Sequence, residues 1–276
     1  MKVVHFLNPD GDPRLGVLHD STVTDAGPAG PEGFVPSDES WAVIADASGP
    51  EHALGEVRLL PPVRPGRIAA IGLNYRSHAE ESELDVPDVP VVFAKWSSAV
   101  IAHDEPIVVP REETRPDFEG ELAIVIGRRT YRADRTGARD AIGGITAIND
   151  VSGRRAQLET PLRQFTLGKS FDTFAPLGPC IASLDGIELD DIRVSTTVSG
   201  ELMQDASTRD LIFPVLDLIV YLSAGLTLEP GDVIATGTPG GVGDSRRPPR
   251  YLREGDVVEV TVEGVGTLRN PVRLEQ

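Results

Sequence analysis

Residues 117–126 read DFEGELAIVI, so an acidic segment runs directly into an apolar one. The apolar half, residues 121–126, predicts a β-strand. Because side chains alternate between the two faces of a strand, Glu119 and Glu121 are expected to point the same way. Two adjacent carboxylates raise each other's pKa unless a positive group lies between them. This segment is therefore the first candidate for a binding site.

A third carboxylate follows the next apolar stretch. Residues 145–148 are apolar and end in Asn149 and Asp150. Three carboxylates at strand ends form the ligand set that a hard divalent cation such as Mg²⁺ prefers, with water or substrate in the remaining positions. The Glu119–Glu121 pair by itself is more typical of an edge strand with a solvated acidic face. The neighbouring motifs decide between the two interpretations.

Composition limits the class of protein. The chain has 276 residues, 40% hydrophobic and 25% charged, which is typical of a globular protein with one large domain and room for a small one. A net charge of −17 argues against a nucleic-acid surface, though not against small anionic substrates. The single cysteine, Cys180, excludes an internal disulfide and a cysteine-based zinc site. We find no signal peptide and no membrane span, so we expect a cytoplasmic enzyme.

The chain divides at its densest proline-rich segment, PPVRPG at residues 61–66. We expect a small N-terminal domain at residues 1–62, with a β-hairpin at its start, and a catalytic domain at residues 65–276. The fold class predicted is α+β and β-rich. Strands are expected at residues 68–73, 91–94, 121–126, 145–148, 192–198, 232–236 and 257–262, a helix at 214–223, and short helices after Tyr75 and Asp134.

Two glycine-containing segments resemble nucleotide-binding loops but fail on detail. Residues 167–170, LGKS, end like a phosphate-binding loop, yet Arg163 stands where its first glycine belongs. Residues 237–243, GTPGGVG, lack the spacing of a dinucleotide fingerprint. Residues 237–243 could still form a tight turn beside a ligand, because glycine permits positive φ and a close approach of the backbone.

Three further side chains are candidates for catalysis. If the chain turns helical after Tyr75, His78 and Glu81 lie at i and i+3 on one face, where the carboxylate would orient the imidazole as a general base. A surface helix with both side chains in water is the alternative. Lys169 lies in a segment with two aromatic residues and is expected to be half-buried beside carboxylates or an anion, although a lysine at the surface is the commoner case.

Together these segments resemble the fumarylacetoacetate hydrolase family. No single motif decides the resemblance, but the motifs occur in the family's order and cover about residues 65–273. They are GLNY at 72–75 with His78 and Glu81, DFEGE at 117–121, NDVS at 149–152, GKSFD at 168–172, TGTP at 236–239, and the tail with EGD at 254–256 and GTLRNP at 266–271.

The resemblance implies a mixed β-sandwich roll, a homodimer and a bound Mg²⁺ or Mn²⁺. It also implies roles for nine residues: metal ligands Glu119, Glu121 and Asp150; a water-activating dyad of His78 and Glu81 on a lid; Lys169 beside the metal; and substrate contacts from Arg154, Gln157 and Thr238. Two positions depart from the pattern of many relatives. Arg155 follows Arg154, which favours a surface ion pair over a contact with a second substrate carboxylate, and Trp96 follows Lys95, where it could reshape a pocket wall.

By this resemblance the substrate is a small 2-oxo acid, and the intact dyad favours a hydrolase. Such an enzyme cuts the carbon–carbon bond of an acylpyruvate, as in fumarylpyruvate from aromatic catabolism, after His78 and Glu81 activate water. Two alternatives within the family stay open, oxaloacetate decarboxylation and the isomerisation of 2-hydroxymuconate-type dienes, because both use the same metal and enolate chemistry. A carboxylate-rich metal-binding or scaffold protein without catalytic activity is the alternative outside the enzymes. Neither a nucleic acid nor a membrane is expected as a partner.

Overall fold

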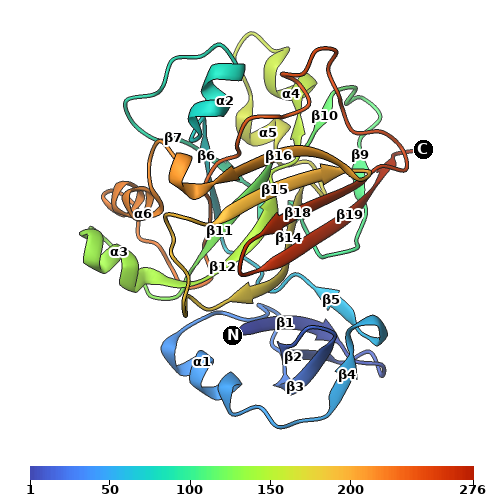
Figure 1. Cartoon of the computed structure of the whole chain (residues 1–276), viewed down its shortest axis with the longest axis vertical. Helices are drawn as coiled ribbons and strands as arrows, with labels where there is room; N and C mark the ends of the chain where they lie inside the picture. Colours follow the sequence, from blue (N-terminus) through green and yellow to red (C-terminus); the bar gives the residue numbers. More distant parts are fainter.

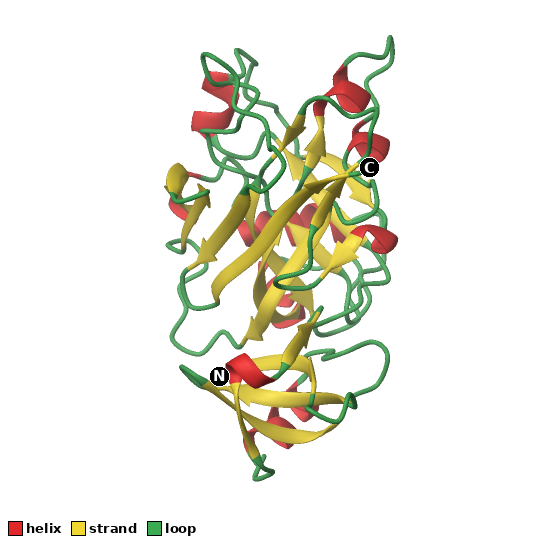
Figure 2. Ribbon diagram, turned by 90° about the vertical axis from the view of Figure 1, so that its right-hand side faces the viewer, coloured by secondary structure: helices red, strands yellow, loops and turns green.

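The structure is a computed structural model that describes residues 1–276. Strands dominate it, and none of its six α-helices is longer than nine residues. Figure 1 shows the N-terminal strands as a separate layer below the larger body, and Figure 2 shows the same arrangement from the side. No helix is long and apolar enough to cross a membrane.

Two sheets pack face to face in the larger body, and the main hydrophobic core lies between them. In the first sheet, neighbouring strands follow the order β14 (Ala175–Ala182), β12 (Ile142–Asn149), β11 (Gly120–Ile126), β17 (Val233–Ala235), β6 (Ile68–Gly72) and β7 (Val91–Lys95). In the second the order is β16 (Glu201–Ser207), β15 (Arg193–Val198), β18 (Val257–Val262), β19 (Gly266–Leu274) and β9 (Ile107–Val109).

The central position of β11 determines where the acidic motif lies. Leu122, Ile124 and Ile126 belong to the main core, while Ala123 and Val125 belong to a second core on the other face of the sheet. Every residue of the strand is buried, and β12 and β17 flank it. The alternative of an edge strand with a solvated acidic face is therefore wrong. Burial on both faces also explains why the apolar run is continuous and not alternating.

Helices and short segments surround these sheets. They are α2 (Arg76–Glu81), α3 (Arg135–Ala141), α4 (Arg154–Leu158), α5 (Phe165–Gly168), α6 (Val215–Ser223), two 3₁₀ turns (Ser97–Ala99 and Thr208–Asp210), and the short strands β8 (Val100–Ile101), β10 (Pro116–Asp117) and β13 (Ser152–Gly153). All seven predicted strands and the three predicted helices are present. Pro214 is the N-cap of α6, and Asp134 caps α3 by accepting from the backbone N–H of Gly137.

The N-terminal strands continue the first sheet. They are β1 (Lys2–Leu7), β2 (Pro13–Leu18), β3 (Thr22–Pro28), β4 (Glu51–Ala53) and β5 (Arg58–Leu60), with helix α1 (Asp38–Ala45) and a 3₁₀ turn (Leu54–Glu56). The predicted hairpin is the β1–β2 pair. β1 also pairs with β14, and Trp41 Nε1 donates to the carbonyl of Gly143 at 2.8 Å. Separate domains at residues 1–62 and 65–276 stay a prediction.

Candidate metal centre and active site

The antiparallel pairing of β11 with β12 brings three carboxylates together. Gly120 at the start of β11 pairs with Asn149 at the end of β12. The backbone N–H of Asp150 donates to the carbonyl of Glu119 at 2.8 Å, which fixes the two chain ends side by side. One carboxylate oxygen each from Glu119, Glu121 and Asp150 lies within 4.8 Å of the others, and all three residues are buried. The sequence-predicted metal ligands therefore converge.

Gly120 is required between the two glutamates because the facing sheet approaches closely there. A Cβ at this position would lie 2.0 Å from Thr196 Oγ1, and 3.1 and 3.2 Å from the two methyl carbons of Val260. Any larger residue would push the two sheets apart. The spacing Glu-Gly-Glu is therefore a packing requirement as well as a way to place two carboxylates.

Two buried lysines partly neutralise the cluster. Lys169 Nζ donates to Glu119 Oε2 at 2.7 Å, to Asp150 Oδ2 at 2.7 Å and to Ser152 Oγ at 2.9 Å. Burial opposes the charge of Lys169, but Asp150 and Glu119 outweigh it and hold its pKa above the ordinary value. Lys95 Nζ lies 2.7 Å from Asp150 Oδ1; burial lowers its pKa, and the charge of Lys169 contributes to that decrease.

Glu119 and Glu121 have opposite electrostatic environments. Burial opposes ionisation of Glu119, yet Lys169 and Arg154 outweigh it and lower its pKa. Burial and the neighbouring carboxylates of Asp150 and Glu119 raise the pKa of Glu121 well above its ordinary value. Glu121 accepts a hydrogen bond from the backbone N–H of Gly237 at 2.7 Å and forms no ion pair. The cluster thus has room for one more positive charge, and its all-oxygen donor set fits a hard divalent cation such as Mg²⁺ or Mn²⁺.

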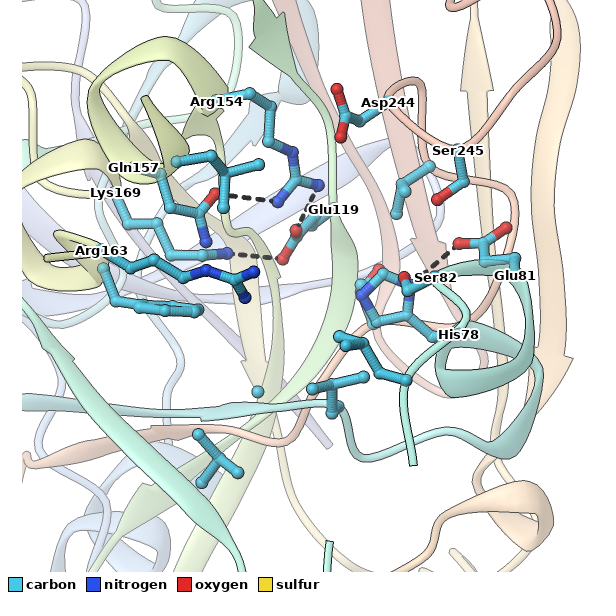
Figure 3. Close-up of a pocket in the computed structure, with 18 of the residues that line it drawn as sticks. His78, Glu81, Ser82, Glu119, Arg154, Gln157, Arg163, Lys169, Asp244 and Ser245 are labelled. Atoms are coloured by element: carbon cyan, nitrogen blue, oxygen red, sulfur yellow. Dashed lines mark hydrogen bonds and ion pairs between the residues drawn. The ribbon is translucent and has the colours of Figure 1, made fainter. Parts of the chain in front are cut away.

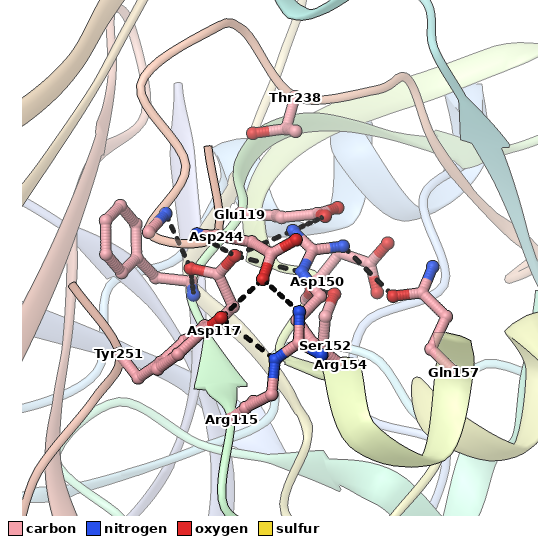
Figure 4. Close-up of polar contacts among 12 residues, drawn as sticks. Arg115, Asp117, Glu119, Asp150, Ser152, Arg154, Gln157, Thr238, Asp244 and Tyr251 are labelled. Atoms are coloured by element: carbon pink, nitrogen blue, oxygen red, sulfur yellow. Dashed lines mark hydrogen bonds and ion pairs between the residues drawn. The ribbon is translucent and has the colours of Figure 1, made fainter. Parts of the chain in front are cut away.

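Arg154, at the start of α4, joins the cluster to a further buried carboxylate, that of Asp117 (Figure 4). Its Nη2 donates to Glu119 Oε1 at 2.6 Å and its Nε to Asp117 Oδ2 at 2.9 Å. Its Nη1 donates to Gln157 Oε1 at 3.0 Å, so the amide nitrogen of Gln157 is left for another acceptor. Glu113 holds this helix in place, because its carboxylate accepts from the backbone N–H groups of Arg155 and Ala156.

The predicted dyad forms on α2. His78 Nδ1 lies 2.8 Å from Glu81 Oε1, at i and i+3 of the helix. Since the carboxylate can only accept, Nδ1 carries the hydrogen and Nε2 is the nitrogen available to a substrate. The two side chains are 12% and 22% exposed. Figure 3 shows them across the pocket from Lys169 and Arg154.

The glycine-rich loop at residues 237–244 connects the two halves of the site. Its backbone N–H groups donate to three carboxylates: Gly237 to Glu121 at 2.7 Å, Gly241 to Glu81 at 2.6 Å, and Gly243 and Asp244 to Asp117 at 2.7 and 3.0 Å. At Gly241, where φ is +105°, a Cβ would lie 2.1 Å from the carbonyl of Met203. The loop backbone therefore has to pass close to the backbone of Met203 here, which only glycine permits. The same loop also brings its N–H groups to carboxylates of the site.

One cavity of about 310 Å³ joins these groups. It is lined by seven of the nine predicted site residues: His78, Glu81, Glu119, Arg154, Gln157, Lys169 and Thr238. Glu121 and Asp150 lie beside Glu119, outside this lining. The hydroxyl of Thr238 already donates to the carbonyl of Gly120 and accepts from Gln204 Nε2. A substrate contact by this hydroxyl would have to share or replace one of these bonds.

The two departures from the family pattern lie outside the cavity. Trp96 is 53% exposed and does not line it. Arg155 is also exposed, with its Nε 3.9 Å from Glu159 Oε2, in keeping with the expected surface ion pair. Neither residue reshapes the pocket wall directly.

Sequence reasoning missed several residues of the site. Lys95 could not be recognised, because a lone lysine after a strand is typical of a surface. Asp117 lies in the quoted motif, but nothing in the sequence indicated that it would join Arg154 to the glycine-rich loop. Gln204 stands on a strand that was not predicted. In the sequence, Arg163 stands out only as the residue that breaks a phosphate-loop pattern, yet it lines the cavity.

A β-rich fold with a buried carboxylate cluster opposite a histidine–glutamate pair is the arrangement of a metal-assisted acid–base enzyme. Comparison with known proteins identifies the family. The model of the fumarylacetoacetate (FAA) hydrolase C-terminal family matches residues 67–273, so the chain belongs to this family. This confirms the resemblance and the fold class.

Relatives in this family have different activities. The chain is 44% identical over 228 residues to an oxaloacetate tautomerase of Bacillus subtilis, covering 80% of this chain and 75% of the relative. The structure of a 5-carboxymethyl-2-hydroxymuconate delta-isomerase from Mycobacterium smegmatis is similar over 100% of both chains, with 35% identity and a TM-score of 0.82. A fumarylacetoacetate hydrolase from Exiguobacterium antarcticum matches over 100% of both chains, with 36% identity and a TM-score of 0.84.

Proposed function

We propose that the protein is a divalent-cation-dependent tautomerase of a 2-oxo dicarboxylic acid, with oxaloacetate as the model substrate. The observation that carries this proposal is the His78–Glu81 pair, which shares one cavity with Lys169 and Glu119 of the carboxylate cluster. A base on one side of a cavity and concentrated positive charge on the other suit the removal of a proton next to a carbonyl group. Relatives that are oxaloacetate tautomerases and isomerases support the same chemistry.

The proposed reaction moves one proton. His78 Nε2 takes a proton from C3 of the keto acid, the C–H electron pair becomes the C2=C3 double bond, and the carbonyl electron pair moves to the C2 oxygen. Glu81 stabilises the imidazolium that forms, because it holds the Nδ1–H. The protonated His78 then returns a proton to the C2 oxygen, which completes the enol with no change in composition.

The remaining residues bind and orient the substrate. The cation, when held by Glu119, Glu121 and Asp150, supplies Lewis-acid stabilisation of negative charge on the 2-oxo acid. Lys169 adds a fixed positive charge on the same side of the cavity. The free amide nitrogen of Gln157 donates to a substrate oxygen, and the bond that Arg154 makes to its Oε1 sets the orientation of that amide. The ring centroid of Phe93 lies 5.0 Å from Lys169 Nζ, which adds a cation–π interaction to this charge.

Hydrolysis of an acylpyruvate is the second candidate function. The dyad that favours it is intact, and a water between His78 and the substrate would become the nucleophile in place of direct proton removal. The similar structure of the Exiguobacterium hydrolase supports this candidate. Oxaloacetate decarboxylation needs only the stabilised enolate and makes no use of the dyad.

Direct assay distinguishes these activities. Enol and keto oxaloacetate differ in ultraviolet absorbance, so the approach to equilibrium can be followed with Mg²⁺, with Mn²⁺ and with a chelator. We expect faster interconversion than in buffer with either ion, and loss of the acceleration with the chelator. Cleavage of fumarylpyruvate or a shorter acylpyruvate without any acceleration of tautomerisation would overturn the proposal in favour of the hydrolase.

We further propose a twofold homodimer in the cytoplasm. Closed symmetric dimers are the commonest soluble oligomers, and the resemblance of the sequence motifs to the fumarylacetoacetate hydrolase family implies a dimer. Light scattering at micromolar concentration should report twice the mass of the 29.5 kDa chain. A monomer under these conditions would contradict the dimer.

A further inference from the structure

Three arginines line the cavity, and Arg163 differs from the other two. Arg154 uses its guanidinium on Asp117, Glu119 and Gln157. Arg247 Nη1 lies within hydrogen-bonding distance of three backbone carbonyls of its own loop, residues 244–246. Arg163 makes no hydrogen bond or ion pair with the protein. Figure 3 shows its guanidinium among the side chains that line the cavity, on the side of the pocket where Lys169 is drawn.

The cavity runs from buried residues at the carboxylate cluster to exposed residues at its mouth, and Arg163 lies at the exposed end. Glu119 is 4% exposed and Lys169 is 3% exposed, whereas Arg163 belongs to the exposed connection between α4 and α5. The backbone N–H of Gln164 donates to the carbonyl of Gln157 at 2.9 Å, which closes this connection into a compact hairpin. A substrate with its 2-oxo acid group at the carboxylate cluster would therefore direct its other end outward, toward Arg163.

The charges of the buried cluster can balance only one substrate carboxylate. Four carboxylates (Asp117, Glu119, Glu121 and Asp150) face three cations (Lys95, Lys169 and Arg154), so the cluster carries one net negative charge when all are ionised. A divalent cation would change this to one net positive charge, which balances a single substrate carboxylate. A second carboxylate needs a cation of its own, because the same cavity is also lined by Glu81, Glu83 and Asp244 and the chain has a net charge of −17.

We propose that Arg163 binds the second carboxylate of a 2-oxo dicarboxylic acid and thereby determines the class of substrate. The proposal rests on the proposed function only in placing the 2-oxo acid group at the cluster. A planar guanidinium suits this role, because it donates two parallel hydrogen bonds to one carboxylate. Since Arg163 has no partner in the protein, binding the substrate breaks no existing ion pair.

The test compares two stable ligands of equal carbon number, 2-oxoglutarate and 2-oxopentanoate, by calorimetric titration of the Mg²⁺-loaded protein. They share the 2-oxo acid group and differ in the distal carboxylate. We expect wild-type protein to prefer 2-oxoglutarate. Arg163→Ala should weaken 2-oxoglutarate binding about 10-fold to 100-fold, in the range of hydrogen bonds to charged groups, and leave 2-oxopentanoate within about twofold.

Two further variants separate the specific role of Arg163 from general effects. Arg163→Lys should recover part of the preference because it keeps the charge and loses the paired hydrogen bonds. Arg155→Ala removes the same charge from the neighbouring helix α4, outside the cavity, and should change neither affinity. Equal weakening of both ligands in Arg163→Ala, no weakening of either, or wild-type protein that lacks the preference would overturn the proposal. Absence of tautomerase activity together with the expected ligand pattern would overturn only the proposed function.

Discussion

The two halves of the candidate site are built in opposite ways. The carboxylate cluster lies at the ends of central strands β11 and β12, fully buried, with Lys169, Lys95 and Arg154 in contact with its members. The dyad lies on the six-residue helix α2, with both side chains partly exposed. From the rest of the chain, Glu81 receives one hydrogen bond, from the backbone of Gly241.

This difference assigns the two tasks of the site to different parts of the fold: the buried cluster places charge, and the dyad on α2 is placed to transfer protons. A buried network in which nearly every group has a partner is rigid, and losing one member leaves a neighbour uncompensated. A helix of six residues is too short to be stable without tertiary contacts, which here come from buried Tyr75 and Ala79 and from the glycine-rich loop. We therefore interpret the cluster as the preorganised half and α2 as the half that can open.

The largest effect should come from removing the least compensated carboxylate. Glu121→Gln keeps the size of the side chain and an acceptor for Gly237, but it removes one anionic ligand of the proposed cation. Divalent-ion binding by calorimetry should be lost, and activity should fall to the background rate. Thermal unfolding of the chelator-treated variant should occur at the wild-type temperature or above, because a buried like-charge repulsion is relieved.

Glu119→Gln is the matched control for that result. It should also abolish ion binding, but it should lower the unfolding temperature of the chelator-treated protein. Lys169 and Arg154 would each lose a charged partner in the core. Equal stability changes in the two variants, or chelator-sensitive activity in Glu121→Gln, would contradict the asymmetry inferred for the pair.

His78→Ala should reduce tautomerisation by roughly 10²–10⁴-fold, the usual contribution of a general base. Ion binding should survive, since His78 is outside the cluster. Decarboxylation of oxaloacetate should decrease much less, because it needs no base at this position. A variant that keeps the wild-type rate of tautomerisation would exclude the dyad from proton transfer and favour the decarboxylase.

A smaller effect should follow from weakening the connection between the two halves. Asp117→Asn keeps the shape of a side chain that accepts from Arg154, Gly243 and Asp244, but it removes the charge. We expect the free energy of unfolding to decrease by about 1.5–3 kcal/mol, measured by urea denaturation. The rate should fall less than in His78→Ala. A variant as stable as the wild type would show that the charge of Asp117 is unnecessary for the connection.

The sequence predicts the cluster better than its surroundings for a physical reason. Glu119, Glu121 and Asp150 adjoin strong apolar runs, so strand period and pairing alone place them together. Strand β14 was missed because Pro176, Gly178 and Pro179 interrupt its pattern, and these residues are tolerated only in a particular tertiary setting. Lys95 acquires its role from Asp150, and Asp117 from Arg154 and Gly243. These contacts join residues 37 or more positions apart, which no local pattern contains.

The smallest predicted effect concerns the end of α2. The backbone N–H of Leu84 donates to the carbonyl of Ala79 and that of Glu83 to Glu80, which is the hydrogen-bond pattern of a Schellman motif. Glu83 occupies its left-handed position with φ +55°, where glycine is preferred. Glu83→Gly should slow hydrogen exchange within residues 76–84 by stabilising the helix by up to about 1 kcal/mol. Glu83→Asn, which tolerates this conformation better than glutamate, should give a smaller change in the same direction. Because the cluster lies on separate strands, ion affinity should not change in either variant.

Faster exchange in Glu83→Gly would contradict this prediction. It would show that the side chain of Glu83, and not its backbone strain, determines how firmly the dyad is held.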